Sequence, residues 1–295
     1  MMIEAFNRRK MMKLSRPIIL TSQLLLLTSL SGFAMAQQVV NETRDMDADA
    51  SLSIELVSGE IDVQGWDRDS FELTGRLGND KDKLVIEGDS GGWNIEVKPK
   101  GGWGWKGSSG NTSLILKVPH GVELEADSVS ADLNIKGLDG EELMLETVSG
   151  DMRIEVQSEA ISISTVSGDV EMQAKGSQLD YESVSGDLEA TGIVTELDVE
   201  TVSGDFEIVG AHLEDVSASS VSGDIDLELT LNEGADIELE SHSGKIVLLL
   251  PEGTDFEFEA DTFSGDIDNK LGSNDDADTN ISAETFSGNI IIKSN

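Results

Sequence analysis

The sequence predicts an all-β protein built from stacked two-strand repeats, and three observations support this fold class. First, the word Val-Ser-Gly-Asp, or a close variant, recurs from residue 129 onward. Second, successive copies of its serine lie 18 to 23 residues apart, a spacing typical of stacked repeats. Third, apolar and polar residues alternate on both sides of the word. The serines are Ser130, Ser149, Ser167, Ser185, Ser203, Ser222, Ser243, Ser264 and Ser287.

The alternation predicts two short strands in each repeat, joined by a turn. In one repeat, Leu143 and Leu145 lie before the word, and Met152 and Ile154 lie after it. This period of two excludes a helix, whose apolar residues recur every three to four positions. The apolar set occupies odd positions before residues 148–151 and even positions after them, so the turn must lie there.

Two architectures fit this pattern, an antiparallel meander and a parallel β-solenoid, also called a β-helix. In the meander, Ser-Gly is the two-residue loop of a hairpin. In the solenoid, the word is a corner, and each coil stacks on the previous one so that equal residues lie above one another. The sequence favours a solenoid with coils of 18–23 residues, because a stack repeats one environment in every coil and explains why whole words recur.

Each residue of the word has an expected role at the corner. We expect the glycine to hold a positive φ angle and the aspartate to cap neighbouring backbone amides as an Asx-type turn. The valine or phenylalanine before the serine is expected to point into the core. The corner glycines are Gly150, Gly168, Gly186, Gly204, Gly223 and Gly265.

The chain divides into three parts. Residues 1–36 predict a cleaved signal peptide, because basic residues precede an apolar run and Ala34-Met35-Ala36 supplies a cleavage site. Residues 37–113 predict diverged strands and a cap, with a Gly-rich loop that contains two tryptophans. Residues 114–295 predict the regular repeat array.

Both ends of the chain carry further expectations. The apolar run of residues 17–30 is shorter than the ~20 residues that a membrane span needs and is interrupted by polar residues. We therefore expect export to the periplasm or cell surface, with no integral membrane span after cleavage. The last coil, residues 284–295, has apolar strands without an obvious cap, which predicts end-to-end self-association.

Composition limits the partners. The chain carries 58 acidic and 20 basic residues, a net charge of −38, and loss of residues 1–36 would leave −42. Nucleic acid is not expected as a partner, since it is bound through Lys and Arg. Cationic partners and divalent cations are compatible with the charge, and acidity also keeps a protein soluble. With 0 cysteines, disulfides, thiol catalysis and Cys-ligated metals are excluded.

These features together resemble the DUF4097 family, the "putative adhesin" family of exported bacterial strand-repeat proteins. The resemblance covers roughly residues 42–294. It rests on the segment SIELVSGEIDVQGWDRD, the apolar-Pro-x-Gly turns at Pro119 and Pro251, and the repeated SGD words. It implies a right-handed parallel β-solenoid and a location in the cell envelope or outside the cell. It implies no settled activity and carries over no catalytic residues.

The aspartates of the word are the first candidate site. Stacked in neighbouring coils they would lie ~5 Å apart, and calcium between them would relieve their repulsion. The alternative is a hydrogen-bonded corner that solvent screens, because one carboxylate per coil supplies few ligands. The candidate ligands are Asp151, Asp169, Asp187, Asp205 and Asp224.

The Gly-rich loop is the second candidate site and departs from the family pattern. Its tryptophans could stack on a sugar or anchor a protein partner, and its lysines form a basic cluster in an acidic chain. The alternative is that the loop covers the open first coil. The residues concerned are Trp103, Trp105, Lys98, Lys100 and Lys106.

Catalytic motifs are missing from the sequence. His120, His212 and His242 are far apart, and neither a nucleophile elbow nor a phosphate-binding loop occurs. We therefore expect no enzyme and, calcium aside, no cofactor. The predicted function is an adhesin-like binding or structural module whose partner is an envelope or surface component, protein or glycan. The alternatives are a carbohydrate-active β-helix enzyme and a protein that assembles through calcium.

Overall fold

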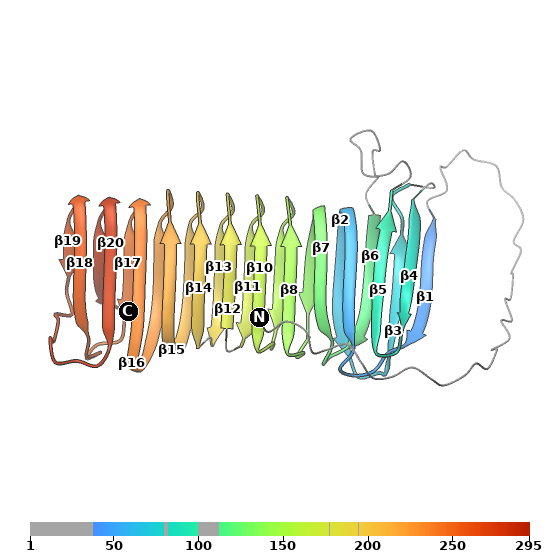
Figure 1. The fold of residues 1–295 in the computed structure, drawn as a ribbon, viewed down its shortest axis with the longest axis horizontal. Coiled ribbons are helices and arrows are strands. Elements are labelled where there is room, and N and C mark those ends of the chain that lie inside the picture. The colour runs from blue at the N-terminus through green and yellow to red at the C-terminus, as the bar shows by residue number, and fades with distance from the viewer. Residues whose placement is uncertain (1–37, 80–81, 100–111, 177, 194) are drawn as a thin grey trace, which may run out of the picture. The chain divides into compact units, whose positions relative to one another are not determined.

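A computed structural model describes residues 38–79, 82–99, 112–176, 178–193 and 195–295. Figure 1 shows the strands of these residues side by side in one stack. All regular elements in these ranges are strands, and none of the described residues forms a helix able to cross a membrane. The prediction of an all-β fold is confirmed.

Parallel strands form a first ladder from the segment that precedes each word. Equal positions face one another in this ladder: Ile161 lies opposite Leu143 on one side and Leu179 on the other. This parallel pairing excludes the antiparallel meander. In spatial order the ladder contains β7 (Glu123–Lys136, first half), β8 (Glu142–Thr147), β10 (Ala160–Thr165), β12 (Gln178–Ser183), β14 (Glu196–Thr201), β15 (Phe206–Ser220, second half), β16 (Ile225–Ser243, second half), β20 (Asn280–Ser287) and β18 (Glu257–Ser264).

The segment that follows each word forms a second parallel ladder. Here Met172 lies opposite Ile154 and Ala190, one repeat away on either side. In spatial order the ladder contains the second half of β7, β9 (Met152–Val156), β11 (Val170–Lys175), β13 (Leu188–Ile193), the first halves of β15 and β16, β17 (Ile246–Leu250), β21 (Ile290–Ser294) and β19 (Ile267–Asn269).

The core lies between the two ladders, where the alternating apolar residues meet. Leu143, Leu145, Met152 and Ile154 are all buried, as their alternation predicts. The same positions of the other repeats supply further buried residues, among them Tyr181 and Phe206. The stack is therefore held by one continuous apolar interior.

The N-terminal part of the described chain joins the stack through β2 (Ser51–Trp66). This strand runs through both ladders and pairs with β7 on one side and with β5 (Gly92–Lys98) and β6 (Thr112–Pro119) on the other, all parallel. The outermost pairings at this end are antiparallel, unlike those of the repeats. They involve β1 (Val39–Asp45), β3 (Ser70–Arg76) and β4 (Lys83–Asp89).

The C-terminal end departs from the order of the sequence. The last coil of the chain, β20 and β21, lies between the coil formed by β16 and β17 and the coil formed by β18 and β19. At the left of Figure 1, β18 and β19 therefore form the edge. The prediction that residues 284–295 are an exposed edge is wrong: Ile290 and Ile292 are buried, whereas Ile267 of β19 is exposed.

The corner glycines do not hold the positive φ angle predicted for them. Positive φ angles occur instead at glycines such as Gly234 and Gly253 in longer turns, and at Gly59 in the related word VSGE of residues 57–60. A Cβ placed on Gly186 would overlap the carbonyl oxygen of Gly168 and lie 3.0 Å from its carbonyl carbon. Glycine is thus required by the close approach of successive coils, a contact that the turn sequence alone does not reveal.

Candidate functional site

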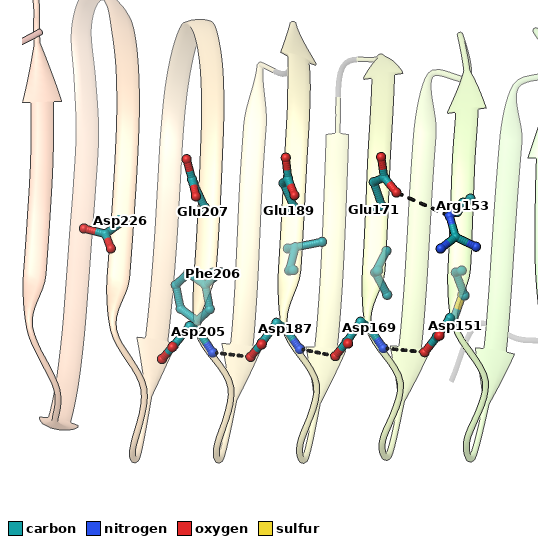
Figure 2. A pocket seen from close by; sticks show the side chains of 13 residues that line it. Asp151, Arg153, Asp169, Glu171, Asp187, Glu189, Asp205, Phe206, Glu207 and Asp226 are labelled. Carbon is teal, nitrogen blue, oxygen red and sulfur yellow. Dashed lines mark hydrogen bonds and ion pairs between the residues drawn. The ribbon is translucent and has the colours of Figure 1, made fainter.

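The aspartates of the words form a continuous row of hydrogen bonds. Asp151 Oδ1 accepts a hydrogen bond from the backbone N–H of Asp169 at 3.3 Å, and Asp169 Oδ1 accepts one from Asp187 at 3.1 Å. The same contact continues from Asp187 to Asp205 at 2.9 Å and from Asp205 to Asp224 at 2.7 Å. Each carboxylate thus caps a backbone amide of the next coil rather than one of its own turn, which is not the Asx-type contact that the turn sequence predicted (Figure 2).

Near the end of this row, two repeats carry a residue other than aspartate at this position, and they show what the contact requires. The N–H of Lys245, which occupies the aspartate position of its repeat, donates to Asp224 Oδ1 at 2.8 Å. In the coil built on β20 and β21, Asn289 Oδ1 accepts the N–H of Asp266 at 3.0 Å. An amide oxygen therefore serves as well as a carboxylate, so the contact itself requires no negative charge.

A groove of about 480 Å³ runs along the second ladder beside this row. Figure 2 shows Glu171, Glu189 and Glu207 at the same height on successive strands above the aspartates. Met152, Val170, Leu188 and Phe206 also line it. Arg153 is the one cation among the described residues that line the groove, and its Nε lies 3.4 Å from Glu171 Oε2. At the groove's end, Lys245 Nζ lies 3.5 Å from Asp226 Oδ1. We call this surface the acidic groove.

The acidic groove does not bring metal ligands together. Among the described ranges, no group of three or more His, Cys, Asp or Glu side chains is arranged to hold a metal ion. One oxygen of Asp151, Asp169, Asp187, Asp205 and Asp224 is already occupied by a backbone amide. Calcium binding thus stays a prediction, and the hydrogen-bonded corner accounts for these residues without it.

The valine before each serine points away from the core, contrary to the prediction. Val148 and Val184 each expose 48% of their surface, while the preceding Thr147 and Ser183 are buried. The alternation itself carried this signal: with Leu143 and Leu145 inward, position 147 must be inward and 148 outward. An inward valine at position 148 is therefore incompatible with an inward Leu143 and Leu145 on the same strand.

Most of the Gly-rich loop lies outside the described residues. Trp103, Trp105, Lys100 and Lys106 fall within the range 100–111, so their predicted role stays a prediction. Lys98 ends β5, where its Nζ lies 2.7 Å from Glu96 Oε2. Hydrogen bonding to that carboxylate raises the pKa of Lys98.

The histidines are not brought together. His120 contacts the carbonyl oxygen of Gly137 near the N-terminal end of the stack, and the backbone N–H of His212 donates to Thr230 Oγ1 at 3.0 Å. His242 occupies the valine position of its repeat and stacks on Phe286. His120 Nε2 also lies 3.6 Å from Asp67 Oδ1, so the carboxylate that His120 approaches is not one of the acidic groove.

Fold and site together define an all-β protein with parallel, coil-on-coil strand pairing and an acidic groove. The profile of the family described as Toastrack DUF4097 matches residues 50–293, and the chain belongs to this family. The predicted family membership is confirmed. No curated protein matches the chain.

Three solved structures, described as putative adhesins or as a putative cell adhesion protein, share little sequence with the chain. A "putative adhesin" from Bacteroides fragilis NCTC 9343 is 12% identical over 89% of this chain and 100% of that one, with a TM-score of 0.45. A "putative adhesin" from Parabacteroides merdae ATCC 43184 is 11% identical over 85% and 96%, with a TM-score of 0.36. A "putative cell adhesion protein" from Clostridium sporogenes ATCC 15579 is 10% identical over 88% and 100%, with a TM-score of 0.23.

Proposed function

We propose that this protein is an exported, non-catalytic module of the cell envelope or cell surface that binds a cationic protein or glycan component through its acidic groove. We also infer that the stack winds as a right-handed solenoid whose corners are the SGD words. The observation that carries the proposal is the row of Glu171, Glu189 and Glu207, repeated at one height on successive strands (Figure 2).

The carboxylates along the acidic groove repel one another. Neighbouring strands lie ~4.8 Å apart, so equal carboxylates of successive coils repel one another wherever solvent does not screen them fully. Arg153 and, at the groove's end, Lys245 neutralise only part of this charge. A cationic partner laid along the groove would relieve the repulsion and be drawn toward it from solution.

Uniformity also favours binding over catalysis. Acid–base catalysis by two carboxylates needs two environments that set their pKa values apart. Along the acidic groove each coil presents Asp and Glu in nearly the same surroundings, since the repeats superpose residue on residue. Such a surface suits an extended partner with repeated charges.

Titration with decalysine at physiological ionic strength tests the proposal, using the protein from residue 37 onward. The variant E171Q/E189Q/E207Q removes three charges from the acidic groove. We expect its affinity for decalysine to fall at least fivefold, because the local charges that hold the probe are lost.

The matched control removes the same number of charges from the first ladder, as D180N/E196Q/D198N. It should change the affinity by less than twofold. An equal loss in both variants would mean that decalysine responds to net charge alone, and the acidic groove would no longer be the proposed site.

A further inference from the structure

The outward valines form a row along the ends of the first-ladder strands, where each valine precedes the serine of its word. Between 40% and 51% of the surface of each is exposed. Backbone hydrogen bonds hold them in register, since the N–H of Ser167 donates to the carbonyl of Val148 and the N–H of Ser185 to that of Val166, both at 2.9 Å. The row contains Val129, Val148, Val166, Val184, Val202 and Val221. We call it the valine row.

Aromatic side chains extend the valine row toward the C-terminal edge. His242 stacks on Phe286, and Phe286 stacks on Phe263, with ring centroids 5.0 Å apart in both pairs. Phe263 exposes 79% of its surface and Phe286 51%. A stripe of exposed valines and stacked rings, His242 among them, thus runs from Val129 to Phe263 in the edge coil, which single exposed residues on an ordinary surface would not produce.

A hollow of about 660 Å³ runs beside the valine row, and its far side carries carboxylates. Glu146, Glu182 and Glu200, which lie on β8, β12 and β14, line it together with the valines. A second hollow of about 530 Å³ continues past the aromatic rings, lined by Glu240 and Glu284 among others. Apolar and acidic rows therefore lie parallel along one groove, which we call the valine groove.

This pairing of chemistries selects among partners. Anionic membranes and nucleic acids would meet the carboxylates as like charges. A second copy of the chain, with a net charge of −38, would bring the same acidic rows against each other. A partner that offers both apolar and basic side chains satisfies both rows.

The spacing selects the conformation of that partner. Coils repeat every ~4.8 Å, whereas residues on one face of an extended strand repeat every ~6.6 Å. In an α-helix the pitch is ~5.4 Å, and side chains at i, i+3, i+4 and i+7 form one stripe. A helix laid along the groove can therefore present about one apolar side chain to each coil over several coils.

We propose that the valine groove binds a basic amphipathic α-helix of a partner protein, with its apolar stripe on the valine row and its basic residues on the neighbouring glutamates. The proposal goes beyond the function assigned to the acidic groove and uses different residues. Failure of one binding experiment therefore leaves the other intact.

The test is a fluorescence titration of the protein from residue 37 onward with a labelled 18-residue Leu/Lys peptide of helical apolar period. Such a peptide spans ~27 Å, close to the ~24 Å covered by six coils. The variant V166S/V184S/V202S should weaken binding at least tenfold, because the apolar contacts are lost. E182Q/E200Q should weaken it severalfold while keeping the row apolar.

Matched controls separate the groove from the rest of the surface. The variant V39S/I115S/V209S removes three exposed apolar side chains elsewhere and should bind as the unmodified protein does. A peptide of equal composition but scrambled period should bind at least tenfold more weakly. Three results would overturn the proposal. They are equal binding of both peptides, unchanged binding by V166S/V184S/V202S, and a dimer of the chain that V166S/V184S/V202S dissociates.

Discussion

Asp187 shows at the scale of one residue how a side chain joins three coils. Its Oδ1 accepts the N–H of Asp205 at 2.9 Å, and its own N–H donates to Asp169 Oδ1 at 3.1 Å. The first contact needs an oxygen acceptor on a short side chain. Asn289 supplies such an oxygen without a charge at the equivalent position.

Replacing Asp187 separates the acceptor from the charge. D187N should keep the free energy of unfolding within about 0.5 kcal/mol of the unmodified protein, because the acceptor remains. D187A should lower it by about 1 kcal/mol, since the amide of Asp205 loses its partner but can still be hydrated. Urea unfolding with excess chelator measures both.

Adding calcium to the same unfolding experiments tests the alternative that the aspartates bind a metal. If calcium raises the urea midpoint of the unmodified protein and D187N abolishes that rise, the aspartates are ligands and the corner role is incomplete. Magnesium at equal ionic strength controls for simple screening.

At this scale the sequence supported some predictions and missed others. The position of the corner and the inward Leu143 follow from alternation, and local chemistry identified aspartate as a cap but not the amide of the next coil as its partner. The reason for Gly186 lies in the carbonyl of Gly168, one coil away, so no property of the turn could reveal it. The outward position of Val148 follows from its parity with Leu143 and Leu145, because the alternation of the strand continues into the turn.

At the scale of elements, the C-terminal coils show what repeat sequences leave open. Every word offers the next coil a similar surface, so sequence order alone cannot decide which coil stacks on β16 and β17. Residues 251–256 and 270–279 connect β17 to β18 and β19 to β20, and these longer links allow one place to be skipped. Charge then suits β18 to the edge, since Glu257, Glu259 and Asp261 discourage pairing with another chain.

Hydrogen exchange distinguishes the two coil orders. The strands β20 and β21 pair on both sides, whereas β18 and β19 pair on one side only. We therefore expect backbone amides in β20 and β21 to exchange at least tenfold more slowly than those in β18 and β19. Peptides resolved by mass spectrometry after pepsin digestion give these rates.

The strand β17 is the internal reference for this measurement, because it is paired on both sides by β16 and β21. Its exchange should resemble that of β21. Fast exchange in β20 and β21 with slow exchange in β18 and β19 would restore the order of the sequence and contradict the pairing described above.

At the scale of the whole molecule, stability reflects the balance between a continuous core and a strongly negative surface. The full chain has a net charge of −38, and in the stack equal carboxylates face one another at the strand spacing. Exposed ion pairs such as Lys136–Glu155, at 2.9 Å, offset little of this repulsion. Conditions that reduce the negative charge should therefore favour the folded state.

The pKa of Asp127 predicts how the stability of the protein changes with pH. Burial raises the pKa of Asp127 above its ordinary value, and Glu146, Glu125 and Glu55 raise it further. Its folded state thus binds the proton more tightly than the unfolded state does, so its contribution is greatest below the unfolded pKa and is lost as pH rises through the folded pKa. Acidification from pH 7 toward pH ~4, near the ordinary pKa of an aspartate, should therefore raise the urea midpoint.

Replacing Asp127 tests its share of this effect. D127N should stabilise the protein at pH 7 by a few tenths of a kcal/mol after solvent screening and flatten the pH dependence. A midpoint that falls steadily on acidification would instead mean that ion pairs outweigh the repulsion.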